Sequence, residues 1–306
     1  MAKKKNAAPQ QTKIFLAVPM YGGQCTGVFV QSLLALSGMF SANGVTLQCA
    51  FMFNESLITR ARNNLTHQFL ETDCTHLLFI DADMKFFAED IFRMLVCDKD
   101  VMVAICPKKE INWGTVHEAA MRGERELHRF TGSFVVNLLQ NTASITVPQD
   151  QPFPVAAGGT GIMLVKREVF KKLQKTTPIF RNDMSHMTAG KPVYQYFTES
   201  IDPESGRLLS EDYHFCHAWR RAGGTVWAAP WCRIGHFGTY LFEGQLVQTA
   251  APAAPVNWPK VLKAAGSKPA VVTKIAPPVK KGTKSGSANG NGRRSTAVAR
   301  GKGARA

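Results

Sequence analysis

The chain has no Cys-x-x-Cys pair, no internal repeat and no apolar run that approaches the roughly 18 residues of a membrane span. Its seven cysteines are an odd number and stand mostly on apolar stretches, which indicates small core residues in a reducing compartment. The basic residues 3–5 and the apolar residues 14–18 loosely resemble a signal peptide, but this run is too short and ends at Pro19. These absences predict a cytoplasmic protein without a membrane span.

Acidic residues are missing from both ends of the chain. Residues 251–306 hold twelve Lys and Arg, and residues 1–12 hold three Lys, with no acid in either segment. The body between them balances 22 basic with 22 acidic residues, so the formal net charge of +15 belongs to the ends. This excludes a body-wide nucleic-acid surface and leaves weak, salt-dependent polyanion binding to the C-terminal tail. The Ala/Pro/Lys/Gly composition of 251–306 predicts disorder, as it does for the basic N-terminus.

The first half of the body alternates short apolar runs with amphipathic stretches. Three successive strand–helix repeats predict an α/β fold with a mostly parallel sheet and right-handed crossovers. The expected strands are 13–19, 46–53, 76–81 and 101–106, and the expected helices are 25–42, a second from Ser56 or Thr59 to about residue 71, and a third from Ala88.

The pattern is looser after Pro107. A long aperiodic stretch at 178–209 and a shorter one at 233–240 are expected to be loops. The expected elements are strands at 132–138, 156–166 and 225–229 and helices at 167–174 and 210–221, the last with Ser210, Glu211 and Asp212 at its start.

The most informative segment is 76–84, where four apolar residues lead directly into Asp81 and Asp83. Such a run predicts a strand buried on both faces, and Asp, a poor strand former, marks the strand's end. Open α/β sheets bind ligands at the carboxyl ends of their strands. Two carboxylates at that edge suit a hard divalent cation shared with the phosphates of a substrate. The alternative is a chance D-x-D at a solvated strand end.

Four motifs follow one another in a recognisable order along residues 13–240. They are Val18-Pro19-Met20-Tyr21, Ala61-Arg62-Asn63, Asp81-x-Asp83, and Glu211-Asp212 with Arg220-Arg221-Ala222-Gly223. Together they resemble GT-A-fold glycosyltransferases, and they are similar to the inverting enzymes of family 2. The Q-x-x-R-W motif of processive synthases is absent, which disfavours a polymerising enzyme, and the usual acid after the second strand is replaced by Asn54-Glu55.

This resemblance implies a metal-dependent transfer of a sugar from a nucleotide-sugar donor to a hydroxyl acceptor, with inversion. It implies Mn²⁺ or Mg²⁺ bound by Asp81, Asp83 and His236, and an imidazole ligand favours Mn²⁺. Asp83 is the expected direct ligand, whereas Asp81 holds the ribose or a metal-bound water. A His236 that only hydrogen-bonds to a backbone carbonyl is the alternative.

An inverting transfer needs a base that takes the proton of the acceptor hydroxyl. Asp212 is the expected base and Glu211 the substitute, and ordinary helix capping is the alternative for both. The helix dipole is expected to lower the pKa of Asp212.

The donor is expected to meet Pro19, Tyr21, Arg62, Asp81 and Gly159. Tyr21 would stack on the base and Arg62 would meet the diphosphate, unless Arg62 lies on a solvated helix face. The glycines of 158–161 would let the backbone approach the sugar. Acceptor contacts are expected after the fourth strand, from Lys108, Lys109 and Trp113.

The resulting prediction is one catalytic domain at 13–250, with a nucleotide-binding half at 13–107 and an acceptor half at 108–250. The acceptor is left open as a glycan, lipid, protein or modified DNA. A nucleotidyltransferase of similar fold is one rival, although residues 21–24 lack the basic residue usual for that class. A nucleic-acid-associated protein that uses the basic tail, including a glycosyltransferase acting on modified DNA, is the other.

Overall fold

The structure is a computed structural model of the 306-residue chain, and it describes residues 11–139, 147–183 and 190–244. The predictions of disordered ends at 1–12 and 251–306 therefore lie outside the described residues, apart from residues 11 and 12. Within the described ranges, no helix combines the length and the apolar character needed to cross a bilayer.

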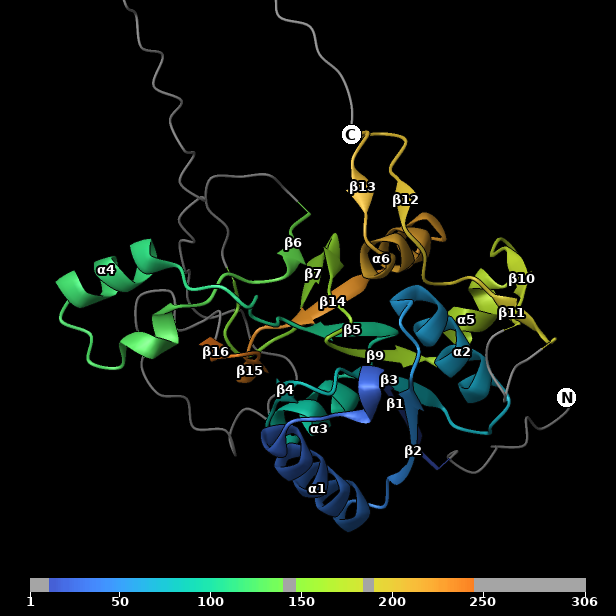
Figure 1. The fold of residues 1–306 in the computed structure, drawn as a ribbon, viewed down its shortest axis with the longest axis horizontal. Coiled ribbons are helices and arrows are strands. Elements are labelled where there is room, and N and C mark those ends of the chain that lie inside the picture. Colours follow the sequence, from blue (N-terminus) through green and yellow to red (C-terminus); the bar gives the residue numbers. More distant parts are fainter. Residues whose placement is uncertain (1–10, 140–146, 184–189, 245–306) are drawn as a thin grey trace, which may run out of the picture. The chain divides into compact units, whose positions relative to one another are not determined.

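A central sheet of seven strands organises the described chain, in the order β2-β1-β3-β9-β5-β14-β7 (Figure 1). β1 pairs in parallel with both β2 and β3, and β14 pairs in parallel with β5, while β9 and β7 run antiparallel to their neighbours. The predicted α/β class, a mostly parallel sheet flanked by helices, is confirmed, because five of the seven strands run in one direction. The strands are β1 (Lys13–Met20), β2 (Thr46–Phe53), β3 (His76–Ile80), β5 (Val101–Ala104), β7 (Phe153–Val155), β9 (Ile162–Lys166) and β14 (Val226–Ala229).

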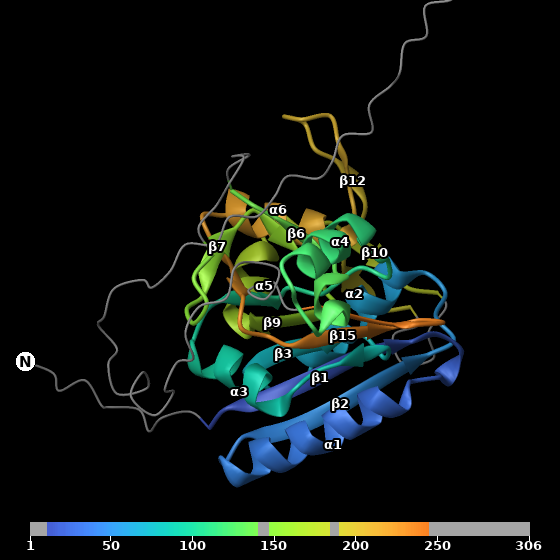
Figure 2. The same ribbon diagram turned by 90° about the vertical axis from the view of Figure 1, so that its left-hand side faces the viewer.

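Helices cover the two faces of this sheet (Figure 2). Alternate residues of β1 and β3 point to opposite faces, so that Phe15 and Phe79 join one core cluster whereas Leu16 and Leu78 join the other. Burial on both faces explains why these strands read as unbroken apolar runs. α1 (Gly27–Ala42) and α3 (Ala88–Val96) lie on one face, and α2 (Ile58–Leu70), α5 (Arg167–Leu173) and α6 (Glu211–Arg221) lie on the other.

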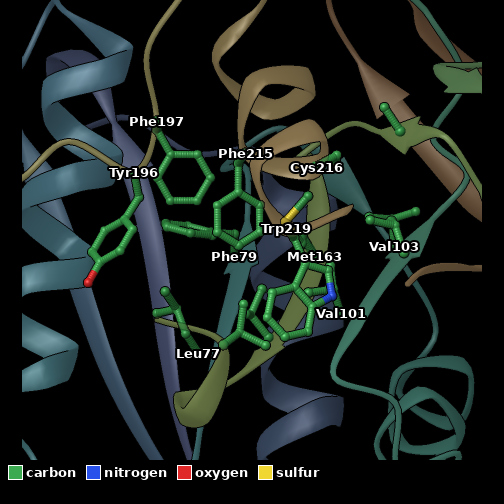
Figure 3. Close-up of a cluster of buried hydrophobic side chains, with 14 of the residues drawn as sticks. Leu77, Phe79, Val101, Val103, Met163, Tyr196, Phe197, Phe215, Cys216 and Trp219 are labelled. Carbon is green, nitrogen blue, oxygen red and sulfur yellow. The ribbon is translucent and has the colours of Figure 1, made fainter. Parts of the chain in front are cut away.

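An aromatic cluster ties α6 to β3 (Figure 3). The ring of Phe197 stacks on Phe215 of α6, with centroids 4.7 Å apart, and meets Phe79 of β3 edge-on at 5.3 Å. The buried amide of Asn63 on α2 holds the Phe197 backbone in place: its Nδ2 donates to the Phe197 carbonyl at 2.8 Å, and its Oδ1 accepts from the Phe197 N–H at 2.9 Å. This packing fixes the start of α6 relative to the end of β3, where Asp81 follows.

Several short elements depart from the sequence prediction. The two stretches expected to be loops contain paired strands, and a helix occurs in the segment after Pro107. Strands of two to four residues carry no periodicity of their own, so only their partners define them. These elements are α4 (Trp113–Met121), η1 (Tyr21–Gly23), η2 (Leu127–Phe130), β4 (Met84–Lys85), β10 (Ile179–Arg181), β11 (Pro192–Tyr194), β12 (Ser200–Ile201), β13 (Leu208–Leu209), β15 (Ile234–Phe237) and β16 (Leu241–Gly244). In contrast, β6 (Val136–Asn137) and β8 (Ala157–Gly158) fall within the strands predicted at 132–138 and 156–166.

The start of α2 also differs from the prediction. Leu57, rather than Ser56 or Thr59, precedes the helix as its N-cap, and no side chain of that residue caps it. The Glu55 carboxylate instead accepts a hydrogen bond from the Leu57 N–H at 3.0 Å, so an upstream acid stabilises this end.

Gly158 gives a test of the close packing between β8 and β5. A Cβ at this position would lie 2.5 Å from Cγ2 of Val103, a fully buried strand residue. We expect Gly158→Ala to lower the free energy of unfolding by about 1–3 kcal/mol, measured by urea denaturation. Gly38→Ala is the control, because a Cβ in that α1 position meets nothing within 4 Å and should raise stability by about 0.5–1 kcal/mol. Effects of the same sign would contradict this account.

Candidate functional site

A cleft of about 960 Å³ opens where β1, β2 and β3 end. Because these strands are parallel, their carboxyl ends meet at one edge of the sheet, as expected for ligand binding in α/β proteins. Five residues predicted from the sequence line the cleft: Pro19, Tyr21, Arg62, Asp81 and Asp83. Gly159, Glu211, Asp212 and His236 are not among its lining residues.

The turn after β1 forms one wall of the cleft. Tyr21 is 72% exposed there, so its ring is free to stack on a ligand. Thr26 caps α1 by accepting a hydrogen bond from the Phe29 N–H at 3.2 Å, and its own N–H donates to the Ala82 carbonyl at 3.1 Å. The N-terminus of α1 is thereby held against the loop that carries Asp81 and Asp83.

Arg62 lies in the wall of the cleft and is almost fully buried, with only 3% of its surface exposed. Its Nη2 donates to Asp81 Oδ1 at 3.1 Å and its Nε donates to Glu211 Oε1 at 3.3 Å. Burial alone would lower the pKa of Arg62, but the charges of Asp81, Glu211 and Asp212 raise it. The alternative of a solvated helix face is therefore wrong, and this guanidinium joins the acids of two separate motifs.

Asp81 and Asp83 have different surroundings although only one residue separates them. Both oxygens of Asp81 accept from Arg62 Nη2, and burial raises the pKa of Asp81 despite this partner. Oδ2 of Asp83 accepts from Lys109 Nζ at 2.5 Å and lies 3.4 Å from His236 Nε2. Burial would raise the pKa of Asp83, but the contacts with His236 and Lys109 keep it below its ordinary value.

His236 reaches Asp83 because β15 pairs with β4. His236 is opposite Met84 in the antiparallel register, and the Phe237 N–H donates to the Asp83 carbonyl at 2.8 Å. Nδ1 of His236 lies 2.9 Å from the carbonyl oxygen of Pro107. Since a carbonyl only accepts, Nδ1 carries a proton and Nε2 faces Asp83. The backbone contact weighed as an alternative is thus present, and it is also how many metal-binding histidines are oriented.

These residues fit a divalent ion only in part. In residues 11–139, 147–183 and 190–244, no group of three or more His, Cys, Asp or Glu side chains is arranged to hold a metal. Asp83 Oδ1, however, is a buried oxygen without a hydrogen-bond partner in the same ranges, and His236 is correctly oriented. One or two protein ligands completed by substrate phosphates and water are common for such ions. Asp83 and His236 fit this kind of site better than Asp81, whose oxygens Arg62 already contacts.

Glu211 and Asp212 begin α6, on the other side of Arg62. Asp212 Oδ1 accepts from the Tyr213 N–H at 2.8 Å and from the Ser210 hydroxyl. Burial, assisted by the neighbouring charge of Glu211, raises the pKa of Asp212. The expectation that the helix dipole lowers this pKa is wrong, because loss of water outweighs the dipole at a half-buried carboxyl group.

Gly159 adjoins the same carboxylate. A Cβ at Gly159 would lie 3.5 Å from Asp212 Oδ2, so the bare backbone leaves room beside this oxygen. Five of the nine predicted site residues thus line the cleft, and His236 and Glu211 are joined to it by their contacts with Asp83 and Arg62. Asp212 follows Glu211 in α6, and Gly159 adjoins Asp212.

The sequence alone does not reveal several contacts of this region. Lys109, which is expected to meet the acceptor, also contacts Asp83, and Trp113, with the same expected role, is 69% exposed and does not line the cleft. Asn63 was read only as part of a motif, without its contacts to Phe197. Glu55 lines the cleft at the end of β2 and forms a bidentate pair with Arg60, at 2.7 and 2.9 Å. An acid two residues after the strand predicted at 46–53 was the available signal for Glu55.

No family model matches the chain, and no curated protein matches it. Similar solved structures include the protein A197 from STIV, with 15% identity and a TM-score of 0.41 over 74% of this chain and 86% of that one. A variant of Drosophila β1,4-galactosyltransferase 7 in complex with manganese, UDP-Gal and xylobiose has 13% identity and a TM-score of 0.37, covering 71% of this chain and 65% of that one. GalNAc-T7 with UDP, GalNAc and Mn²⁺ has 12% identity and a TM-score of 0.37, covering 84% of this chain and 46% of that one. This chain thus spans less than two thirds of the length of either transferase.

Proposed function

We propose that this protein is a metal-dependent glycosyltransferase that moves a sugar from a nucleotide-sugar donor to a hydroxyl acceptor with inversion. One observation carries the proposal. A single cleft at the carboxyl ends of three parallel strands joins an exposed aromatic ring and an acid next to an oriented histidine, and Arg62 connects it to a second pair of acids. These are the parts needed to hold a nucleoside diphosphate and to activate a hydroxyl group.

The donor half is built from the first three strands. Tyr21 stacks on the base, and Pro19 shapes the turn that presents it. The diphosphate lies between the N-terminus of α1, which favours anions, and Asp83. A divalent ion, Mn²⁺ or Mg²⁺, bound by Asp83 and His236 would neutralise negative charge on the departing diphosphate. Arg62 holds Asp81 at the edge of the cleft, where that carboxylate would bind the ribose of the donor or support the metal site.

The acceptor half supplies the base. The acceptor oxygen attacks the anomeric carbon, the bond from that carbon to the diphosphate oxygen breaks, and the acceptor proton passes to the carboxylate of Asp212. A carboxylate with a raised pKa is a stronger base than an ordinary one, and Gly159 leaves space beside it. Glu211 positions this end of α6 through Arg62.

The finer assignment is a non-processive enzyme similar to family 2, with its catalytic domain at 13–250. It is supported by the order of the four motifs, by the cleft that the first three motifs line, and by the contact of Arg62 with Glu211 of the fourth. The turn at residues 21–24 contains no Lys or Arg, which favours this class over a nucleotidyltransferase.

Donor binding can be tested by thermal shift with UDP-, GDP- and dTDP-sugars, with and without Mn²⁺. One donor at about 100 times its Kd should stabilise the protein by about 2.7 kcal/mol, and Mn²⁺ should increase the shift. Asp83→Asn should remove the Mn²⁺-dependent part, because the variant lacks the charged ligand. Asp73→Asn is the control, since that acid is exposed and pairs only with Lys13 among the described residues. A Mn²⁺-dependent shift that survives in Asp83→Asn, or no shift with any donor, would oppose the proposed function.

A further inference from the structure

We propose that Lys109 is a replaceable cation that occupies the metal-binding face of Asp83 and leaves it when the divalent ion binds. This inference rests on the proposed function, because it takes Asp83 as a metal ligand. It adds that the protein carries its own competitor for the metal.

Two groups converge on one oxygen of Asp83. Lys109 Nζ is 2.5 Å from Oδ2, and His236 Nε2 is 3.4 Å from the same atom. An ammonium has three donors and no lone pair, so it cannot share an oxygen lone pair with a metal or coordinate the metal itself. An ion that bridges Asp83 and His236 would approach the carboxylate where Lys109 now lies.

The backbone places Lys109 and His236 together. The Pro107 carbonyl accepts the Nδ1 proton of His236, and the next residue, Lys108, donates its N–H to the Ser133 carbonyl at 2.7 Å. A bridge between Pro107 and Phe134 holds the same segment. The segment that orients the imidazole, Pro107 and Lys108, therefore also fixes the position of the Lys109 backbone.

The acids of the site have two kinds of counter-ion. Asp81 and Glu211 share Arg62, which is 3% exposed and has a planar, fixed donor set. Asp83 has Lys109, whose side chain is 42% exposed and ends in a point charge on a flexible stem. Arg62 cannot leave without stranding two partly buried acids, whereas Lys109 can turn into solvent at little cost. Lys109 is thus the counter-ion suited to exchange.

Exchange of this kind would couple the metal to the donor. Without a donor, the metal must displace Lys109 with no new partner for the ammonium. A bound diphosphate would offer the displaced ammonium two negative charges, so metal and donor should each improve the binding of the other. The affinity of the protein for the metal in the absence of a donor should accordingly be lower than it would be if Lys109 did not compete for Asp83.

The test is a titration with Mn²⁺ alone, with free Mn²⁺ followed by electron paramagnetic resonance. Lys109→Met should bind Mn²⁺ about fivefold more tightly than the wild type, the ratio expected for loss of a competing ion pair of ordinary strength. Lys109→Gln should behave in the same way. Lys108→Met is the matched control, because that lysine is adjacent and half-exposed but pairs with Glu110 at 3.9 Å rather than with Asp83. The affinity of the Lys108→Met variant for Mn²⁺ should stay within about twofold of the wild type.

The outcomes separate this inference from the proposed function. Mn²⁺ binding that requires Asp83 but is unchanged or weakened in Lys109→Met would overturn the inference and leave the function standing. Equal tightening in Lys108→Met would also overturn it, because general charge rather than position would be responsible. Mn²⁺ binding that persists in Asp83→Asn, or is absent from every variant, would count against both.

Discussion

Asp212→Asn should slow sugar transfer by about 10³-fold and leave donor binding intact. General bases contribute roughly 10²–10⁴-fold, and an amide cannot accept the acceptor proton. The substitution keeps the Oδ1 atom that accepts from the Tyr213 N–H, so α6 should still begin in the same place. Transfer rates and donor-induced thermal shifts, measured on the same preparations, check the two halves of this expectation.

The same variant should change the pH dependence and the stability in defined directions. Burial and the charge of Glu211 raise the pKa of Asp212 above its ordinary value of 3.8. A base must be ionised, so the transfer rate of the wild type should rise with pH through this raised pKa, and the acid limb should vanish in Asp212→Asn. Because the folded state binds the Asp212 proton more tightly than the unfolded state, ionised Asp212 costs stability above that pKa. Asp212→Asn should therefore leave Tm unchanged or raise it at neutral pH.

Glu211→Gln is the matched control for the assignment of the base. Glu211 contacts Arg62, so its loss should loosen the start of α6 and reduce transfer by less than the loss of Asp212. A larger rate loss in Glu211→Gln than in Asp212→Asn would reverse the two roles. A fully active Asp212→Asn would remove the proposed base altogether.

Among the variants proposed here, Arg62→Met should cause the largest decrease in the free energy of unfolding. Removing one partner from a buried ionic cluster leaves uncompensated charge and typically costs about 3–5 kcal/mol. Here Asp81 and Glu211 would both lose a donor, while the methionine would still fill space beside the Phe79 ring, which the guanidinium now covers at 5.4 Å. Urea denaturation measures the change in the free energy of unfolding.

Two further variants make the Arg62 prediction specific. Arg129→Met removes an arginine from an exposed pair with Glu126, for which about 0–1 kcal/mol is expected. Adding Glu211→Gln to Arg62→Met should recover part of the loss, because it removes one of the stranded charges. Similar costs for Arg62→Met and Arg129→Met would show that Arg62 is an ordinary surface ion pair.

The central strands and the acids that follow them were predictable from the sequence because their causes are local. β1 and β3 are buried on both faces and are therefore recognisable as continuous apolar runs. The predicted bounds of β2, residues 46–53, are the same as those in the structure. Asp81 and Asp83 stand directly after β3, and parallel pairing of β1 with β3 brings them to the same edge as Tyr21. Membership of the cleft follows from chain direction and burial alone.

Other features of the site depend on contacts that no local pattern records. The resemblance predicts His236 as a metal ligand, but the sequence predicts its segment as a loop. The reason is that β15 has only four residues, too few for an alternating apolar pattern to be recognised. Lys109 was placed with the acceptor, and the opposite sign was expected for the pKa of Asp212. In each case the deciding partner or the surrounding protein mass lies far away along the chain.

The amino-acid sequence by itself thus determined the α/β layers, the ends of the strands and the acids at one edge of the sheet. These features follow from the spacing of apolar residues and from residue type, which are patterns within a few neighbouring positions. Tertiary structure alone decided which basic side chain contacts each acid and how exposed each acid is to solvent. Arg62 reaches Glu211 across 149 residues, and Phe237 bonds to the backbone of Asp83 through the pairing of β15 with β4. Electrostatics in a folded protein depends on distance and dielectric in space, and neither is written in the order of neighbouring residues.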